Sequence, residues 1–227
     1  MTSLLMKFVK KNLKNEPASL KKKRSTPGSP PFDSCNKDDI RRALLKEQGY
    51  LCAYCMQRIS EETDENGYPV TKIEHYQVQS GDNSLQLNIL NMLAVCRGNE
   101  GEAKKLQHCD TSRGNQSLTI NPMNENCEQL VEYETSGEIF SKNGAVQNDL
   151  ANVLKLNNQR LVEYRKYAID AARLAMIGRA GKNKAGTWRK RDLTTEIKRW
   201  KSESDGKFEP FCMAAVYYLE RKLARLP

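Results

Sequence analysis

The stretch CAYC at residues 52–55 places Cys52 and Cys55 so that a single tight turn can bring both thiolates onto one metal ion. Cys96 and Cys109 follow later and enclose a loop that contains two glycines. Zinc prefers four soft ligands in a tetrahedron, and a C-x2-C pair commonly supplies two of them. Although the second pair is more widely spaced than in common zinc sites, we expect all four thiols to bind one structural Zn²⁺ ion.

Other interpretations of these cysteines are a disulfide framework, a redox pair and a mixed zinc site. The chain has seven cysteines, an odd number, and we see no export signal at its start, so a disulfide framework is not expected. A redox C-x2-C pair normally follows a strand within a βαβ pattern, and no such pattern surrounds Cys52. A thiol redox protein therefore stays as an alternative, and His108 stays as an alternative to Cys109 as the fourth zinc ligand.

A second group of chemistry-bearing residues lies around the cysteines. His75 is one of only two histidines, and an imidazole can accept a proton from water near neutral pH. Glu74 and Asp110 are hard oxygen donors of the kind that hold Mg²⁺ or another divalent ion. The amide of Asn91 can fix either a loop or the orientation of the imidazole. Taken singly, Glu74 is explained as a solvated strand residue, Asp110 as a turn former and Asn91 as a cap. Taken together with His75, they favour metal-assisted phosphodiester hydrolysis.

The spacing of apolar residues outside this region predicts an α+β protein. Leu154, Leu161 and Ala168 recur at helical spacing and indicate one buried stripe, whereas residues 68–79 are β-prone. We expect a basic flexible arm over residues 1–37, a zinc-containing module over 38–147 and a helical region over 148–227. The expected elements are a helix from residue 38 to Gly49, a hairpin at 68–79, a short helix at 85–95, short strands within 116–147, and helices from 148, over 190–202 and over 210–225.

The balance of charge favours a polyanionic partner. The formal net charge is +9, and clustered cations bind phosphates by releasing counterions. Lys21, Lys22, Lys23 and Arg24 are the residues we expect to contact nucleic acid without sequence preference, although a solvated tail would look the same. No apolar run approaches the roughly 20 residues needed to span a bilayer, so we expect a cytoplasmic protein with no membrane partner.

In their order along the chain, these residues resemble the pattern of HNH nucleases. In that pattern an acid–His pair precedes an Asn-containing segment that ends at a cysteine, and a later cysteine precedes an Asn or His, a basic residue and a Gly. The wider context is similar to Septu- and retron-associated HNH proteins of the PtuB-like type, over roughly residues 38–165. The segments that carry the resemblance are CAYC (52–55), EH (74–75), NMLAVC (91–96) and CDTSRGN (109–115), with KEQGY (46–50) and LNNQRL (156–161) on either side.

The resemblance implies a ββα-metal (HNH) fold, in which a small zinc-stapled module packs with a mainly helical N- and C-terminal scaffold. It implies that His75 is the general base and that Asn91 is the central asparagine of the motif. Glu74 takes the position of the acid beside the base, which binds the catalytic divalent ion in many members. The remaining implied roles are Asp110 in place of the final His or Asn, Asn115 as an alternative ligand of that ion, and Arg113 as a basic residue that can touch a phosphate.

The same resemblance implies a biological setting. Proteins of this type act in bacterial anti-phage defence beside an ATPase partner (PtuA-like), in some cases with a retron reverse transcriptase and its DNA–RNA product. The leading hypothesis is therefore an endonuclease that is the effector of such a system. The alternative from another class is a zinc-binding module without catalysis that is recruited to nucleic acid or to an ATPase.

Overall fold

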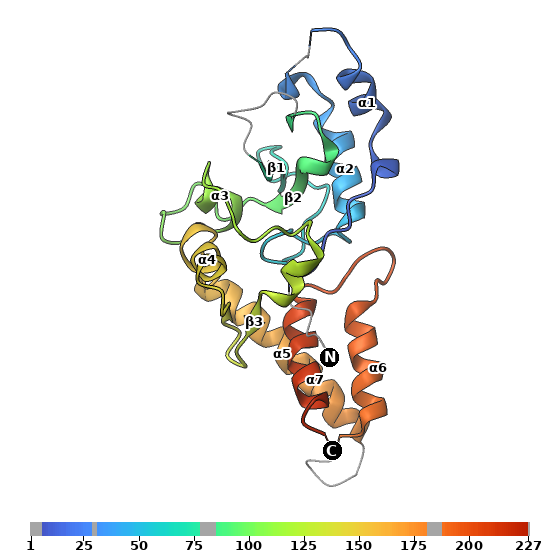
Figure 1. The fold of residues 1–227 in the computed structure, drawn as a ribbon, viewed down its shortest axis with the longest axis vertical. Helices are drawn as coiled ribbons and strands as arrows, with labels where there is room; N and C mark the ends of the chain where they lie inside the picture. The colour runs from blue at the N-terminus through green and yellow to red at the C-terminus, as the bar shows by residue number, and fades with distance from the viewer. Residues whose placement is uncertain (1–5, 29–30, 78–84, 181–187, 227) are drawn as a thin grey trace.

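The structure is a computed structural model that describes residues 6–28, 31–77, 85–180 and 188–226 (Figure 1). Among these residues it contains seven α-helices and two small antiparallel sheets, which confirms the expected mixed α+β class. The strands are β1 (Thr71–His75), β2 (Met92–Cys96), β3 (Glu132–Tyr133) and β4 (Ile139–Phe140). The helices are α1 (Ala18–Arg24), α2 (Lys37–Glu47), α3 (Cys109–Arg113), α4 (Gly144–Asn148), α5 (Gln159–Ala180), α6 (Lys190–Lys201) and α7 (Cys212–Leu223). Short 3-10 turns span Leu13–Asn15, Phe32–Ser34, Ile89–Asn91 and Glu125–Gln129, and a π-helical turn spans Asp149–Val153.

The described part of the N-terminal segment is packed against the rest of the molecule, which corrects the expectation of a flexible arm. Met6, Val9 and Leu20 are buried in the core. Lys11 forms an ion pair with Glu47 of α2 at 2.5 Å. The physical reason is that a few well-spaced apolar side chains anchor the segment, even though lysines dominate its composition.

Helix α2 forms for the local reasons visible in its sequence. The side chain of Asn36 accepts hydrogen bonds from the N–H groups of Asp38 and Asp39, both at 3.2 Å, and the two acids lie where the helix dipole favours them. Ile40 and Leu44 are fully buried on the side of the helix that contacts β1 and β2. This helix therefore supports the hairpin that carries the candidate site.

Strands β1 and β2 form the antiparallel hairpin at the centre of this region. Thr71 pairs with Cys96 and His75 pairs with Met92. The β-prone stretch at 68–79 thus contains β1, with residues 78 and 79 outside the described residues. The short helix expected over 85–95 is wrong, because a 3-10 turn leads directly into β2. All five residues of β2 are buried, and a short, wholly apolar run does not distinguish a buried strand from a helix.

A loop joins the end of β2 to α3 and brings the two Cys-containing ends together. The His108 N–H donates to the Gly98 carbonyl at 3.0 Å, which closes the loop. Gly98 has a φ of +55°, and a Cβ at this position would lie 1.9 Å from the His108 carbonyl oxygen. Only glycine fits such an approach. In Figure 1 the hairpin lies between α2 and α3.

The region from residue 148 onward is helical, as the sequence predicts. Helix α5 packs against α7 and α6, and α6 packs against α7. The buried carboxylate of Glu196 in α6 binds Arg179 of α5 at 2.8 Å, which ties two of these helices together. The expected short strands are confirmed as β3 and β4, joined across Gly137. Among the described residues, no helix combines the length and apolarity needed to cross a bilayer.

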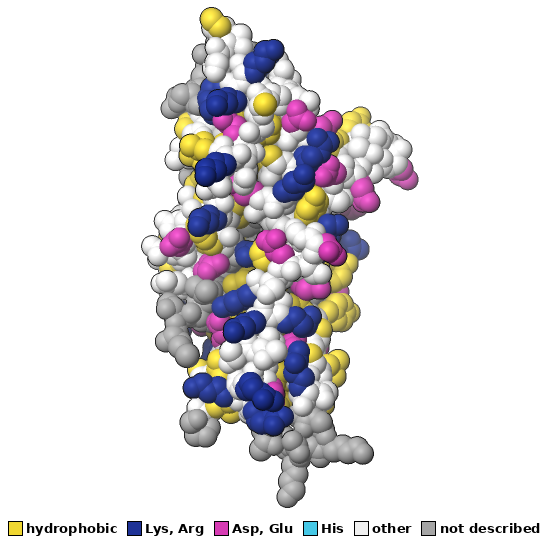
Figure 2. Space-filling model, turned by 90° about the vertical axis from the view of Figure 1, so that its right-hand side faces the viewer, with side chains coloured by type: hydrophobic (Ala, Val, Ile, Leu, Met, Phe, Trp, Pro, Cys, Tyr) yellow, Lys and Arg dark blue, Asp and Glu magenta, His cyan; other side chains and the backbone are white. Residues whose placement is uncertain are grey.

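Charge is spread over the surface instead of gathering in one place. Figure 2 shows Lys and Arg side chains along the whole length of one face, with Asp and Glu side chains between them. Many of these charges are paired locally, such as Arg42 with Glu61 at 3.0 Å and Lys201 with Glu220 at 2.7 Å. The net charge of +9 therefore gives a general attraction for polyanions, and on the face drawn in Figure 2 the cations do not gather into one patch.

Candidate functional site

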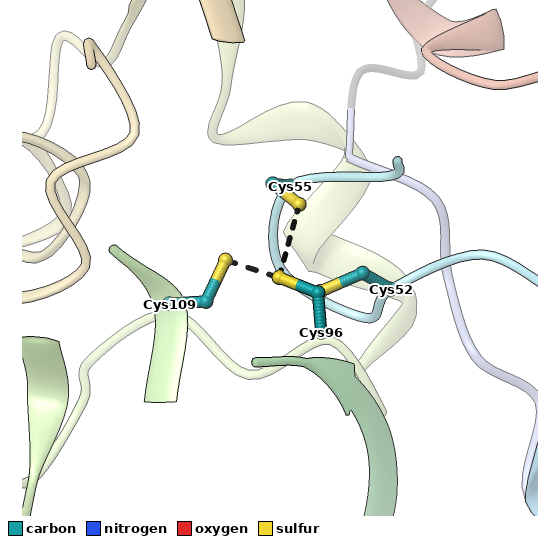
Figure 3. A group of neighbouring side chains, drawn as sticks. All are labelled: Cys52, Cys55, Cys96 and Cys109. Carbon is teal, nitrogen blue, oxygen red and sulfur yellow. Dashed lines mark hydrogen bonds between the residues drawn. The ribbon is translucent and has the colours of Figure 1, made fainter. Parts of the chain in front are cut away.

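The four cysteines predicted to bind zinc come together from three parts of the fold (Figure 3). Cys52 and Cys55 lie in the turn after α2, Cys96 ends β2 and Cys109 begins α3. All four side chains are buried, and their sulfur atoms lie within 4.8 Å of one another. The Cys52–Cys109 and Cys55–Cys96 sulfur pairs are separated by 3.9 and 3.8 Å.

These distances fit one tetrahedral thiolate-bound ion. A Zn–S bond of about 2.3 Å places the sulfur atoms of a tetrahedron about 3.8 Å apart, which matches both measured pairs. Bonded disulfide sulfurs would lie about 2.05 Å apart, and all seven cysteines are free thiols. The cluster can therefore hold a metal ion such as zinc, as the spacing of the cysteines predicts.

The thiols of the cluster do not ionise equally without a metal ion. Burial raises the pKa of Cys55 and of Cys109 well above the ordinary value. Burial also opposes ionisation of Cys52, but hydrogen bonds from the other three thiols outweigh it and hold the pKa of Cys52 well below the ordinary value. One thiolate is thus favoured in the metal-free cluster, and binding of a divalent cation would release the remaining protons.

His108 lies beside the cluster without completing it. Its Nδ1 atom is 3.2 Å from the sulfur of Cys109 and 3.9 Å from that of Cys96. The four sulfur atoms already form a compact group of ligand atoms without the imidazole. The geometry therefore favours Cys109 over His108 as the fourth ligand, with His108 placed to donate a hydrogen bond to a thiolate.

A buried arginine supplies positive charge near the cluster. Arg165 of α5 is fully buried, and its Nε and Nη2 groups donate to the carbonyls of Gly137 and Leu156, both at 2.6 Å. Burial lowers the pKa of Arg165, whereas Coulombic attraction to Cys55 and Cys109 raises it. Four thiolates and one divalent cation carry a net charge of −2, so a nearby guanidinium is a suitable counter-charge.

Glu74 belongs to a buried network that joins the cysteine turn to β1 and α3. The guanidinium of Arg113 forms an ion pair with the Glu74 carboxylate and donates to the Tyr54 hydroxyl at 3.0 Å. That hydroxyl donates in turn to Glu74 at 3.1 Å. Because Tyr54 lies between the two cysteines of the turn, the network positions Glu74 relative to the metal centre.

Asp110 brings a second carboxylate to Glu74 from the first turn of α3. Burial, a hydrogen bond with Asp110 and the charge of Asp110 together raise the pKa of Glu74 to about 8, against the opposing charge of Arg113. The ammonium of Lys72 lies 2.6 Å from the Asp110 carboxylate. Two carboxylates from β1 and α3 therefore meet between two cations. Mg²⁺ is commonly held by one or two such carboxylates, with water and substrate phosphates completing its shell.

His75 follows Glu74 on β1, and its ring contacts groups other than those around Glu74. Its Nε2 atom lies 2.9 Å from the Gln86 carbonyl oxygen, and its ring meets that of Phe32 edge to face at 4.7 Å. A carbonyl oxygen only accepts, so Nε2 carries a proton and the lone pair of the neutral ring belongs to Nδ1. Burial lowers the pKa of His75, which keeps the imidazole neutral near pH 7.

Asn91 organises the loop that follows β1. Its Oδ1 accepts from the Gln77 N–H at 2.8 Å, and its Nδ2 donates to the Gln77 carbonyl at 3.0 Å. A longer contact of 3.4 Å reaches the Leu85 carbonyl. Of the two roles considered for this amide, these bonds correspond to fixing the loop. These hydrogen bonds connect Asn91 to Gln77, which lies two residues after His75, and to Leu85, which precedes the Gln86 that contacts His75.

The remaining predicted residues are Arg113, Asn115 and the four basic residues of α1, and they lie in different parts of the structure. Arg113 is 1% exposed, which corrects the expectation that it can touch a phosphate, because its donors serve the buried network. Asn115 is exposed in the turn after α3. On α1, Lys21 and Lys22 are exposed, Lys23 is half-buried and Arg24 is exposed, with Arg24 in an ion pair with Glu16.

Tyr54, Lys72 and Arg165 belong to the site but were not singled out from the sequence. Tyr54 lies inside the C-x2-C turn and Lys72 lies two residues before Glu74, so strand alternation places Lys72 on the same face of β1. That spacing was a usable signal for Lys72. Arg165 had none, because its approach to the cluster depends on how α5 packs.

Comparison with protein-family models gave no match, and comparison with curated proteins gave no similar sequence. The resemblance to HNH nucleases therefore stays a prediction based on the residues quoted above.

Proposed function

We propose that the protein is an HNH-type endonuclease that hydrolyses phosphodiester bonds with a histidine base and a divalent ion. The observation that carries the proposal is the meeting of Glu74 from β1 and Asp110 from α3 beside the cysteine cluster. Two strands and a helix, with oxygen donors on the first strand and on the helix, support the ββα-metal interpretation that the resemblance implies. The cysteines that bracket these elements support the same interpretation.

In this proposal the two carboxylates hold the catalytic ion. Among the described residues, only the four cysteines bring together three or more His, Cys, Asp or Glu ligands, so Glu74 and Asp110 offer two donors. Two carboxylates suit Mg²⁺ or a similar hard ion that keeps water and phosphate ligands. When bound, such an ion stabilises the charge that develops on the phosphate and on the leaving oxygen. In its absence Glu74 keeps a proton near neutral pH, and Lys72 pairs with Asp110.

His75 is the residue proposed to accept the proton of the attacking water. The Gln86 carbonyl fixes the ring so that Nδ1 is the basic nitrogen, and Phe32 holds the plane of the ring. The lowered pKa of His75 keeps the base unprotonated at neutral pH, the state that general-base catalysis needs. Asn91 supports this arrangement through the loop on which Gln86 lies.

The zinc cluster has a positioning role in the proposal. Cys109 is the first residue of α3 and Asp110 is the second. A metal ion bound at Cys109 would therefore also fix the backbone position from which the Asp110 side chain extends. Cys96 is at the end of β2 and faces Thr71 across the hairpin. Binding of zinc would therefore hold both carboxylate-bearing elements in register.

The proposal is tested by assaying purified protein on plasmid DNA, single-stranded DNA and structured RNA with Mg²⁺ or Mn²⁺. We expect His75→Ala and Asp110→Asn to lower cleavage by at least roughly 10²-fold, the lower range for loss of a general base. Asp205→Asn, an exposed acid outside the site, serves as the matched control. Zinc content and circular dichroism should be unchanged in all three variants. Cleavage by His75→Ala at the wild-type rate would refute the assignment of the base.

The defence setting is proposed on the resemblance alone. A nuclease inside its own host needs restraint, and a PtuA-like ATPase or a retron reverse transcriptase with its DNA–RNA product would supply it. We expect such a gene beside this one. Co-purification of the two products, with cleavage changed by ATP, is the experiment that tests this part.

A second candidate function is a zinc-binding module without catalysis. The observation in its favour is that Glu74 is buried and already ion-paired with Arg113, as in a purely structural network. This candidate predicts zinc binding and nucleic-acid binding with no cleavage by the wild-type protein under any divalent ion. The assay above separates the two candidates, because only the nuclease loses an activity in His75→Ala.

A further inference from the structure

Helix α5 carries a line of exposed apolar residues, one of which, Tyr164, also contacts Phe211 at the start of α7, with ring centroids 5.8 Å apart. Tyr167 is 63% exposed and Leu174 is 61% exposed, and Tyr164 is 42% exposed. Ala171 is also exposed. The spacing of these four residues alternates between three and four positions, which places them in one stripe along the helix. We refer to Tyr164, Tyr167, Ala171 and Leu174 as the α5 stripe.

The α5 stripe is not the face of α5 that builds the core of this chain. Leu161, Ala168 and Ala172 are buried and lie on the side that contacts α7. Isolated exposed apolar residues need no explanation, but a continuous line at coiled-coil spacing is typical of a surface that packs against another helix. The helix has 22 residues and is about 33 Å long at 1.5 Å per residue, which is enough for several layers of contact.

The stripe is complementary to itself when a second copy runs antiparallel. A two-fold axis near residue 169 places Tyr164 opposite Leu174 of the second copy. The same axis places Tyr167 opposite Ala171, so that the largest exposed side chain meets the smallest. A two-fold interface requires this kind of self-complementary pairing, with residue i contacting j and j contacting i.

The charges beside the stripe follow the same symmetry. Glu163, Lys166, Asp170 and Arg173 lie on one flank of it, and Lys166 and Asp170 form an ion pair within the chain. With the two copies antiparallel, Glu163 lies nearest Arg173 of the second copy and Lys166 lies nearest its Asp170. The two-fold that relates these pairs is centred at residue 168, within one residue of the centre that the apolar pairs require. Each flanking charge therefore meets an opposite charge.

We propose that the α5 stripe is the interface of a homodimer in which two α5 helices pack antiparallel. The agreement between the apolar pairing and the charge pairing favours a second copy of this chain over an unrelated partner, because an unrelated partner imposes no symmetry on the sequence of α5. The interface lies on α5 and not on β1 or α3, so the dimer is independent of the proposed nuclease activity.

The first experiment measures the mass of the full chain in solution by analytical ultracentrifugation over a range of concentrations. We expect a dimer, and we expect Tyr167→Glu to raise its dissociation constant by roughly 30-fold or more, as for a central aromatic contact. Tyr68→Glu is the matched control, because Tyr68 is also 63% exposed but lies outside α5. A monomeric wild type, or equal effects of the two substitutions, would overturn the proposal and point to another occupant.

A charge exchange tests whether the partner is a second copy. Glu163→Arg alone places two arginines together at each end of the interface, so the dissociation constant should rise. The double variant Glu163→Arg with Arg173→Glu restores opposite charges only if both residues meet in one homodimer, and dimerisation should return. Failure of the double variant to recover would contradict the antiparallel arrangement, with circular dichroism confirming that α5 is still folded.

Discussion

Gly98→Ala is the substitution that tests most sharply how the loop between β2 and α3 builds the metal centre. Gly98 has a φ of +55°, and an added Cβ would lie 1.9 Å from the His108 carbonyl oxygen. The backbone segments at Gly98 and His108 must separate by more than about 1 Å to relieve this contact, because ordinary packing distances are about 3.5 Å. That movement breaks the 3.0 Å bond from the His108 N–H to the Gly98 carbonyl.

The expected loss follows from these contacts. Left-handed backbone costs about 1–2 kcal/mol for a residue with a Cβ, and a buried donor without a partner costs about 1–3 kcal/mol more. Gly101 lies in the same loop with a φ of +90° and has nothing within 4 Å of an added Cβ. Gly101→Ala therefore carries backbone strain without the clash and is the matched control.

The assay is a competition for zinc between the protein and a fluorescent chelator. Because metal binding is coupled to folding of the site, the extra ~1–3 kcal/mol at Gly98 should weaken zinc binding by about fivefold to 150-fold relative to Gly101→Ala. Thermal unfolding of the zinc-loaded proteins should rank them in the same order. Equal zinc affinity for the two variants would refute the argument that this close approach shapes the metal centre.

Four further predictions concern the site. Since the pKa of Glu74 is raised to about 8, binding of Mg²⁺ or Mn²⁺ at pH 7 should release about one proton, and binding at pH 9 should release almost none. Titration calorimetry in buffers of different ionisation enthalpy measures this release. A binding heat at pH 7 that does not depend on the buffer would contradict the prediction. The same shift means that the folded, ion-free protein holds a proton that the unfolded chain loses above the ordinary pKa of 4.5, so stability should fall as pH rises from about 4.5 to about 8. Glu74→Gln should flatten that slope in urea unfolding, and an unchanged slope would count against it. Phe32→Leu removes the edge contact on the His75 ring and should lower kcat with little change in KM or zinc content, whereas an unchanged kcat would show that the ring is positioned by other groups. Arg165→Met should speed zinc loss to a chelator more than Arg165→Lys does, because the lysine keeps the counter-charge, and equal rates would mean that charge is not its role.

The sequence predicted the cysteine cluster well because ligand chemistry is local. A C-x2-C turn fixes two thiols by itself, and few other residues can serve as partners for a thiolate-bound ion. The helices at α2, α6 and α7 were also predicted, because their apolar residues recur at helical spacing. The strand β2 was missed because a buried run of five apolar residues has no such period.

The details of the carboxylate pair could not be predicted, because they depend on how elements pack. Glu74 and Asp110 were named from the sequence, but the burial that raises the pKa of Glu74 and the closeness of Lys72 arise only when β1 meets α3. For the same reason Arg113 was expected at the surface. Its guanidinium instead joins Tyr54 and Glu74 inside the protein, where a charged residue is found only when it is paired.

We propose that two different metal centres lie side by side, one made of four sulfurs and one made of two carboxylates. Anomalous X-ray scattering from a crystal of the zinc-loaded protein soaked in Mn²⁺ distinguishes them, because the two ions absorb at different wavelengths. We expect zinc among Cys52, Cys55, Cys96 and Cys109, and manganese in contact with both Glu74 and Asp110. Manganese absent from the two carboxylates at saturating concentration, or zinc at another position, would refute the proposal.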